Sequence, residues 1–327
     1  MSPQFVDFDG DGHLDIVAGT FSGSPHLALG GKEGFAQPTQ ILDGGGQRIV
    51  LNQFWNYETK EWDSTQRSDA AAGLPEGHGT SAIAFDWDAD GDLDLLIGDY
   101  KSGRIFRRVN EGKPGAPRFA GINLPVLIGE EPLAIPGRIE TLRPVDWDAD
   151  GRIDLVCGSV EAKNPRSVPA GVYWVRNAGE RGAPRFEAPR ALITAVAELR
   201  PPPALPFGGF YPDAFDVDGD GDLDLVVGAK GHWDEPAREL TETERARKAQ
   251  IERDLEELEG TIETSLETLD QGLQRLGEDS EEAKALVETH QAQFRPLFER
   301  QTKLREEQDG LTFGRKEGYF VWLFERQ

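Results

Sequence analysis

Apolar residues recur along this chain in short runs that predict β-strands. Four runs share one pattern, Leu14 to Ala18, Leu93 to Ile97, Ile153 to Cys157 and Leu223 to Val227. Each is apolar throughout except for one Asp, which is typical of a strand covered on both faces. A glycine follows each run at once. The pattern therefore predicts four equivalent buried strands in a repeat protein.

A longer unit surrounds the second and third of these strands. Residues 110–119 and 177–186 share one ten-residue pattern, with Asn first and Ala-Pro-Arg-Phe last. A strand precedes each copy and a β segment follows it, so one unit has four antiparallel strands in about 60 residues, as a propeller blade does. We therefore expect an all-β propeller of four or five four-stranded blades. The long first repeat leaves room for an extra hairpin around residues 47–57.

A helical pattern replaces the β pattern between residues 237 and 309. Its first half carries a heptad-like apolar seam, and its second half continues to Leu304 with Pro296 inside. Residues 318–324 resemble the third strands of the earlier units, so the chain leaves the last blade and returns to complete it. We expect a propeller over residues 1–236 and 310–327, and a coiled-coil-like antiparallel helical hairpin over 237–309. The hairpin could shield the ring, dock on a partner or a second copy, or cover a binding face. The seam residues are Ile251, Leu255, Leu258, Ile262, Leu266, Leu269, Leu273 and Leu276.

An acidic nonapeptide, D-x-D-x-D-G-x-x-D, overlaps the start of each of the four strands. The carboxylates at positions 1, 3 and 5 can converge on one point, the glycine at position 6 permits a sharp turn, and the Asp at position 9 closes the shell. Oxygen ligands in this arrangement suit Ca²⁺, and we expect about four ions. The expected metal ligands are Asp7, Asp9, Asp11, Asp15, Asp86, Asp88, Asp90, Asp94, Asp146, Asp148, Asp150, Asp154, Asp216, Asp218, Asp220 and Asp224.

Two other positions of the nonapeptide refine this picture. An EF-hand needs a bidentate Glu at position 12, where this chain has apolar residues in all four copies. The four loops are therefore not EF-hands. Position 2 is large and apolar, so its side chain should point away from the ion into a packed layer. The position 2 residues are Phe8, Trp87, Trp147 and Val217.

The nonapeptide and the strand after it resemble the FG-GAP or VCBS-type repeats of integrin-like calcium-binding β-propellers. The resemblance covers residues 3–235 and 311–327. It implies Ca²⁺ in each loop, a ring of blades, and use in adhesion, in sugar binding or as an accessory domain of enzymes. It implies no reaction. Integrin-type rings have seven blades, whereas only four such loops occur here.

Composition narrows the class of partner. The formal net charge is −24, but 18 of the 59 acidic residues lie in the four loops and 20 more lie in residues 237–309. The rest of the chain is close to neutral and has no basic stripe, so nucleic acid is excluded as a partner. No apolar run is long enough to predict a membrane span. The single cysteine, Cys157, falls in a buried strand and is expected to be a core residue.

No signal peptide precedes the first repeat, yet weak Ca²⁺ cages are filled where calcium is abundant. We therefore expect an extracellular or periplasmic protein. No catalytic motif is present, and no catalytic residues are assigned. The leading interpretation is a binding module for a glycan or a protein, with the hairpin as an interaction arm or a site of self-association. The alternative is a polysaccharide lyase or hydrolase, or its accessory propeller. Aromatic loops suit sugar rings, and the expected ligand residues are Trp55, Tyr57, Trp62, His78, His232 and Trp233.

Overall fold

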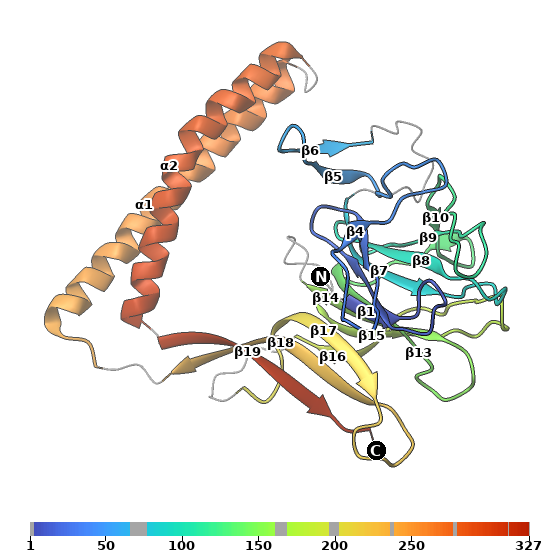
Figure 1. Cartoon of the computed structure of the whole chain (residues 1–327). Helices are drawn as coiled ribbons and strands as arrows, with labels where there is room; N and C mark the ends of the chain where they lie inside the picture. Colours follow the sequence, from blue (N-terminus) through green and yellow to red (C-terminus); the bar gives the residue numbers. More distant parts are fainter. Residues whose placement is uncertain are drawn as a thin grey trace. The chain divides into compact units, whose positions relative to one another are not determined.

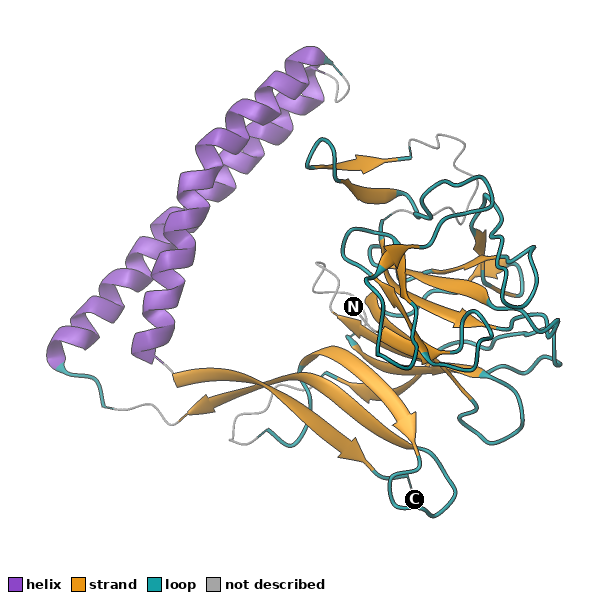
Figure 2. Ribbon diagram, in the orientation of Figure 1, coloured by secondary structure: helices purple, strands orange, loops and turns teal. Residues whose placement is uncertain are grey.

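The computed structural model describes residues 3–65, 77–160, 169–195, 203–235, 239–276, 280–312 and 314–326 (Figure 1). The chain divides into two compact units. The first comprises Met1–Ala197, Ala204–Gly231 and Gly318–Gln327, and the second comprises Glu198–Pro203 and His232–Glu317. The first unit is built mainly of antiparallel sheets and the second mainly of two helices (Figure 2).

Four antiparallel sheets follow one another along the chain. In the second sheet the spatial order β7-β8-β9-β10 is also the chain order, and the first and third sheets follow the same rule. The first contains β1 (Pro3–Val6), β2 (Asp15–Gly19), β3 (Pro25–Ala28) and β4 (Thr39–Gln40). The second contains β7 (Gly79–Phe85), β8 (Asp94–Asp99), β9 (Ile105–Arg108) and β10 (Leu124–Pro125). The third contains β13 (Arg138–Val145), β14 (Asp154–Val160), β15 (Gly171–Val175) and β16 (Arg190–Thr194).

The fourth sheet has three described strands rather than the four expected. They are β17 (Gly208–Phe215), β18 (Asp224–Glu235) and β19 (Gly314–Phe324). β19 follows the helices in sequence but lies beside β18, in the place that the sequence pattern predicts for a third strand. The helices therefore interrupt the sheet between its second and third strands.

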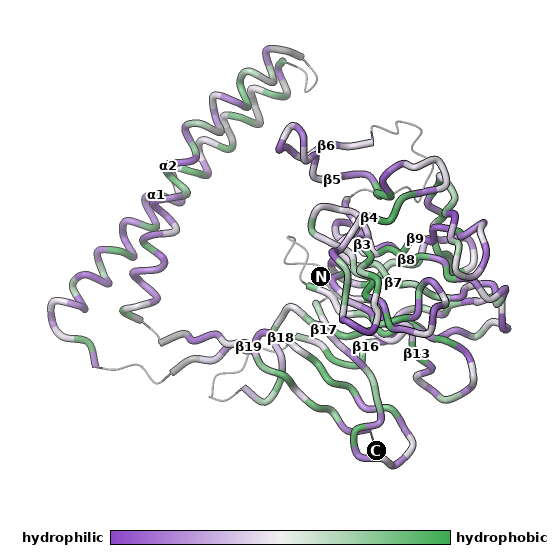
Figure 3. The backbone as a smooth tube through the Cα atoms, viewed as in Figure 1, coloured by the Kyte–Doolittle hydropathy of each residue, from purple (hydrophilic) through white to green (hydrophobic). Residues whose placement is uncertain are grey.

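Apolar clusters join each sheet to the next, and hydrophobic residues recur along the strands that contribute to them (Figure 3). Val17 packs with Leu95 and Ile97 between the first and second sheets. Ile83 packs with Leu155 between the second and third. A third cluster joins the third sheet to the fourth and contains Trp147, Val156, Phe210, Leu225 and Val227. Because β8 and β14 are buried on both faces, the prediction of doubly covered strands holds for the two middle sheets.

Cys157 lies within the cluster between the second and third sheets and is fully buried. Burial raises the pKa of its thiol, which keeps the sulfur protonated at neutral pH. The core role predicted for this residue is therefore confirmed.

Two short hairpins lie outside the four sheets. The first pairs β5 (Gln53–Asn56) with β6 (Glu61–Ser64), and the second pairs β11 (Leu127–Ile128) with β12 (Glu131–Pro132). The extra hairpin expected around residues 47–57 is thus present as β5 and β6, slightly later in the chain. It has two strands and does not form a further four-stranded sheet.

The second unit contains α1 (Glu242–Leu276) and α2 (Glu281–Thr312), which pack against each other. α1 begins with a capping box, because Thr241 Oγ1 accepts the Glu244 N–H and Glu244 accepts the Thr241 N–H. Pro296 lies inside α2, which continues as one helix past it. Neither described helix carries an apolar stretch that could span a bilayer.

The predicted seam is buried in the first half of α1 and more open beyond it. Ile251 and Leu258 pack with Phe294 and Leu304 of α2, whereas Leu266 is exposed. Bidentate hydrogen bonds between Arg247 and Glu307, both at 2.7 Å, tie the two helices together near the start of α1.

We expect Ile83→Ala to lower the free energy of unfolding by about 2–5 kcal/mol, because Ile83 is fully buried between the second and third sheets and its loss leaves a cavity. Urea denaturation in the presence of Ca²⁺ measures this change. Ile122 is an exposed isoleucine of the same unit, and Ile122→Ala should cost about 0.5 kcal/mol or less. Equal losses for the two variants would contradict the assignment of this core.

Candidate metal centres and an aromatic surface

The four acidic loops join the first strand of each sheet to the second, so all four occupy the same place in the repeat. The backbone turns through the left-handed region twice in every loop, at positions 4 and 6. Position 6 is glycine in all copies, as Gly12, Gly91, Gly151 and Gly221, with φ between 82° and 97°. Position 4 is Ala89 or Ala149 in the middle loops, where the same conformation is less favourable for a side chain with a Cβ.

Each loop gathers three carboxylates whose oxygen atoms lie within 4.8 Å of one another. The first and fourth loops combine positions 1, 3 and 9, and the two middle loops combine positions 1, 3 and 5. The clusters are Asp7, Asp9 and Asp15; Asp86, Asp88 and Asp90; Asp146, Asp148 and Asp150; and Asp216, Asp218 and Asp224. The structure therefore brings together three of the four predicted ligands in each loop. All sixteen stay predictions as ligands, and Asp11, Asp94, Asp154 and Asp220 lie outside these clusters.

Buried carboxylate oxygens test whether a cation fits these clusters. Asp7 Oδ1, Asp86 Oδ1 and Asp148 Oδ1 are buried without a hydrogen-bond partner among the described residues. A buried acceptor without a donor is costly. A hard cation at the cluster would satisfy it, so the residues of the first three clusters fit such an ion.

The aspartate at position 9 has a second role that the sequence did not reveal. Asp154 is fully buried, and its carboxylate accepts the backbone N–H of Asn177 at 2.6 Å and the Trp174 Nε1–H at 2.8 Å. Asp94 likewise accepts the Asn110 N–H at 2.6 Å, and burial raises the pKa of Asp94 to about 6. The position 9 carboxylate thus fastens the loop to the end of the third strand.

Arginine side chains neutralise two of the four clusters. In the third, Arg176 bonds Asp148 at 2.6 Å and Asp150 at 2.9 Å, and Arg152 also pairs with Asp150. In the second, Arg107 reaches both Asp88 and Asp94 at 2.6 Å. Within the described residues, the carboxylates of the first and fourth clusters form no ion pair with arginine. The four clusters therefore differ in charge although their sequences are alike.

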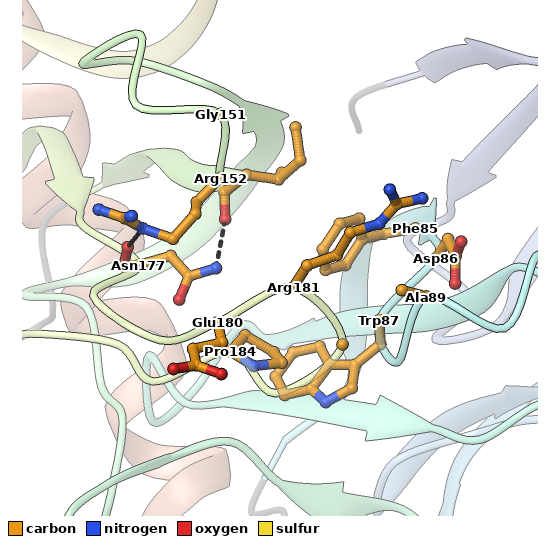
Figure 4. Close-up of a pocket in the computed structure, with 12 residues that line it drawn as sticks. Phe85, Asp86, Trp87, Ala89, Gly151, Arg152, Asn177, Glu180, Arg181 and Pro184 are labelled. Atoms are coloured by element: carbon orange, nitrogen blue, oxygen red, sulfur yellow. Dashed lines mark hydrogen bonds between the residues drawn. The ribbon is translucent and has the colours of Figure 1, made fainter.

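The Asn-first turn that recurs in the sequence lies beside the acidic loop of the preceding sheet. Asn177 Oδ1 accepts the N–H groups of Gly179 and Arg185 at 2.9 and 3.0 Å, which holds the turn in shape. Asn110 does the same in the second sheet. A cavity of about 340 Å³ opens between the second acidic loop and the turn of the third sheet, with Trp87 and Pro184 on its wall (Figure 4).

Aromatic side chains gather at the opposite ends of the strands, where the first strand of the second sheet begins and its second strand ends. The ring centroids of Trp62 and His78 are 4.7 Å apart, those of Phe21 and His78 are 5.1 Å apart, and those of His78 and Tyr100 are 5.2 Å apart. Trp55 contacts Trp62 at 6.0 Å. Phe21 and Trp62 are exposed. We call these five residues the aromatic surface.

His78 lies at the centre of the aromatic surface and is buried, and its Nε2 has no hydrogen-bond partner among the described residues. Burial lowers the pKa of the imidazole, against the opposing effect of Asp99. A neutral ring can exchange one hydrogen bond with a polar group of a ligand. The arrangement thus combines exposed apolar rings with one buried polar group.

Three of the six predicted ligand residues, Trp55, Trp62 and His78, meet in the aromatic surface. Tyr57 lies close by, since Arg48 stacks over its ring at 5.3 Å and also bonds the Trp55 carbonyl at 2.6 Å. Phe21 and Tyr100 were missed, because each lies in a turn where no sequence pattern marks it. His232 and Trp233 belong to the second unit and stay predictions.

We expect Asp154→Asn to destabilise the protein by about 1–3 kcal/mol even in the presence of a chelator, because it weakens the bonds to Asn177 and Trp174. Asp146→Asn, which changes a clustered carboxylate of the same loop, should instead reduce mainly the part of the stability that depends on Ca²⁺. Thermal unfolding of both variants in both buffers separates the two roles. A purely Ca²⁺-dependent effect of Asp154→Asn would contradict the strand-fastening role.

The comparisons with known proteins agree with this geometry. The model of the FG-GAP-like repeat family matches residues 86–157 and 146–227. Each match begins at the first aspartate of one acidic loop and ends in the strand after the next loop. No curated protein matches the chain. Residues 86–227 therefore consist of FG-GAP-like repeats, in which the acidic loops and the antiparallel sheets are in register.

Proposed function

We propose that this protein is a Ca²⁺-stabilised, propeller-like binding module that holds a glycan on the aromatic surface. The observation that carries this proposal is the buried His78 imidazole, whose Nε2 has no hydrogen-bond partner in the described part of the chain, among rings that include the exposed Phe21 and Trp62. Sugar rings stack their C–H faces on aromatic side chains and offer hydroxyl groups to buried polar atoms. Because the acidic loops lie at the other ends of the strands, the ion-binding and ligand-binding roles are separate.

The propeller arrangement is supported by the contacts between sheets. The first strand of the second sheet, β7, contacts the first strands of the first and third sheets, β1 and β13, and β13 contacts β17 of the fourth. First strands that lie side by side are what an arrangement of blades around a common axis requires. We therefore propose that the four sheets are consecutive blades.

The acidic clusters are proposed to hold Ca²⁺ with unequal affinity. In the part of the chain that the structure describes, the first and fourth clusters concentrate negative charge without arginine ion pairs, so a bound cation would be the main source of compensation there. In the third cluster, Arg152 and Arg176 already supply positive charge. A Ca²⁺ ion must either displace these side chains or bind beside them. Weak sites of this kind fill where Ca²⁺ is abundant, so we propose an extracellular or periplasmic location. The helical hairpin is proposed to be an interaction arm.

We expect Arg176→Gln to strengthen Ca²⁺ binding at the third cluster about fivefold or more, because one unit charge a few ångströms from the ion is worth about 1 kcal/mol even in water. Titration calorimetry of the wild-type chain should resolve about four sites, of which the third is weakened by its arginines. The variant should bring that site closer to the others.

Arg295 provides the matched control, since it pairs with Glu299 at 3.3 Å within α2. Arg295→Gln should leave the titration unchanged. A wild-type titration with fewer than three ions, or no response of the third site to Arg176→Gln, would count against this account of the clusters.

For the aromatic surface, we expect Trp62→Ala to weaken glycan binding about tenfold or more, because a stacking ring with a large contact area is lost. An array of neutral and acidic oligosaccharides identifies the probe, and calorimetry with that probe measures the affinity. Phe298→Ala, at an exposed ring of α2, is the control and should have no effect.

Two outcomes would redirect the proposal. Binding that Trp62→Ala leaves intact would place the ligand elsewhere on the molecule. Release of unsaturated or reducing sugars from a polysaccharide would favour the alternative class, an enzyme of polysaccharide breakdown, over a binding module.

A further inference from the structure

The interfaces between consecutive sheets are built from equivalent positions. The position 9 carboxylates show which residues of the third strands match between repeats. They accept the backbone N–H groups of Gly30, Asn110, Asn177 and Arg326 in the four repeats. Counting back five residues from each gives Pro25, Ile105, Val172 and Val321. We call the face of each sheet that is turned toward the next sheet its front face, and the opposite one its rear face.

The front face of the fourth sheet is open. Ile105 and Val172 are fully buried, whereas Val321 at the same position is 74% exposed. Position 2 of the acidic loop shows the same contrast, because Phe8 and Trp147 are buried but Val217 is 44% exposed. The prediction that every position 2 residue enters a packed layer is thus wrong for Val217, because no described sheet follows the fourth.

Glycines at the ends of the second strands confirm this difference. A methyl group added to Gly98 would lie 2.6 Å from Ile139 Cγ2, and one added to Gly158 would lie 2.0 Å from the Phe210 carbonyl oxygen, in each case on the first strand of the next sheet. At Gly228 the nearest atoms belong to Tyr211 of its own sheet, 3.8 Å away. The close approach that the other repeats make is therefore absent here among the described residues.

The rear face of the first sheet is open in a complementary way. Phe119 and Phe186 are buried because their rings contact position 2 of the preceding loop, Phe8 at 6.3 Å and Trp87 at 5.8 Å. Phe35 is the equivalent residue of the first sheet, since the N–H after each of these rings bonds the carbonyl just before the turn. Phe35 is 50% exposed.

We propose that the front face of the fourth sheet binds the rear face of the first sheet of a second copy of this chain. Val217 of one copy then contacts Phe35 of the other, as Phe8 contacts Phe119 within the chain. Two copies joined in this way make two identical interfaces around a twofold axis. The open front face and the open rear face of each copy are then both covered. A second copy of this chain suits the open front face because each front face inside the chain already packs on a rear face of this kind.

The exposed apolar side chains explain why the faces would associate. On β19, Tyr319, Val321 and Leu323 are exposed at alternate positions, which share one face of a strand. On the first sheet, Phe5 and Phe35 are exposed and their rings are in contact at 6.1 Å. Contiguous exposed apolar patches of this kind are typical of interaction surfaces.

The first test is the mass of the full-length protein in Ca²⁺, measured by light scattering or sedimentation. The expected mass is twice the 36.0 kDa of one chain. Val321→Lys should weaken the dimer about 100-fold or more, because a charge must be desolvated in each of the two interfaces. Phe298→Lys, at an exposed apolar position of α2, is the matched control and should leave the dimer intact. A monomeric wild-type protein, or dissociation by Phe298→Lys alone, would overturn the proposal.

Cross-linking decides the orientation and does not depend on the folding of Val321→Lys. Val217→Cys and Phe35→Cys are prepared as separate proteins, mixed, and treated with a short bismaleimide; native Cys157 is buried. The mixture should give a covalent dimer, and each protein alone should not. A doubly substituted chain that cross-links only within itself would show that one copy closes on its own ends, which contradicts the proposal. Absence of any cross-linked dimer would contradict it as well.

Discussion

The buried carboxylate at position 9 is the interaction on which the rest of each repeat depends. It lies at the first residue of the second strand, and it accepts the backbone N–H that follows the third strand, as Asp154 does from Asn177 at 2.6 Å. This one side chain therefore fastens the acidic loop to the end of the third strand of its own sheet. A buried carboxylate is tolerated because these donors satisfy it. The loop then presents its other carboxylates to a common point and its position 2 side chain to the next sheet.

The acidic loops and the aromatic surface lie at opposite ends of the strands. At one end, regular loops gather carboxylates, and arginines from neighbouring strands adjust their charge. At the other end the repeat breaks, and irregular turns bring Phe21, Trp62, His78 and Tyr100 together. Regularity suits a structural ion, since every sheet needs the same turn. The proposed recognition of a ligand needs a surface that differs from repeat to repeat, and the described residues form such a surface where the pattern is lost.

The strands, the order of the sheets and the helical pair could be predicted because they depend on local patterns. Doubly covered strands need continuous apolar runs, an acidic turn needs glycine at position 6, and helices need an apolar seam. The double role of position 9 could not be predicted, because Asp94 and Asn110 are far apart until β8 and β9 pair. The arginine pairs were missed for the same reason: Arg176 and Asp148 meet only across a sheet. The turn that holds Phe21 carries no motif, so nothing marked it as part of the aromatic surface.

The sequence by itself determined the repeat, its acidic loops and the interruption by two helices, because each of these is a spacing of residue types along one stretch of chain. Only the tertiary structure decided which of the residues at matching repeat positions are buried and which are exposed. Ile105, Val172 and Val321 occupy one position of the pattern, yet two are buried and one is exposed. The physical reason is that burial depends on the neighbouring sheet, and a sequence pattern describes the sheet alone.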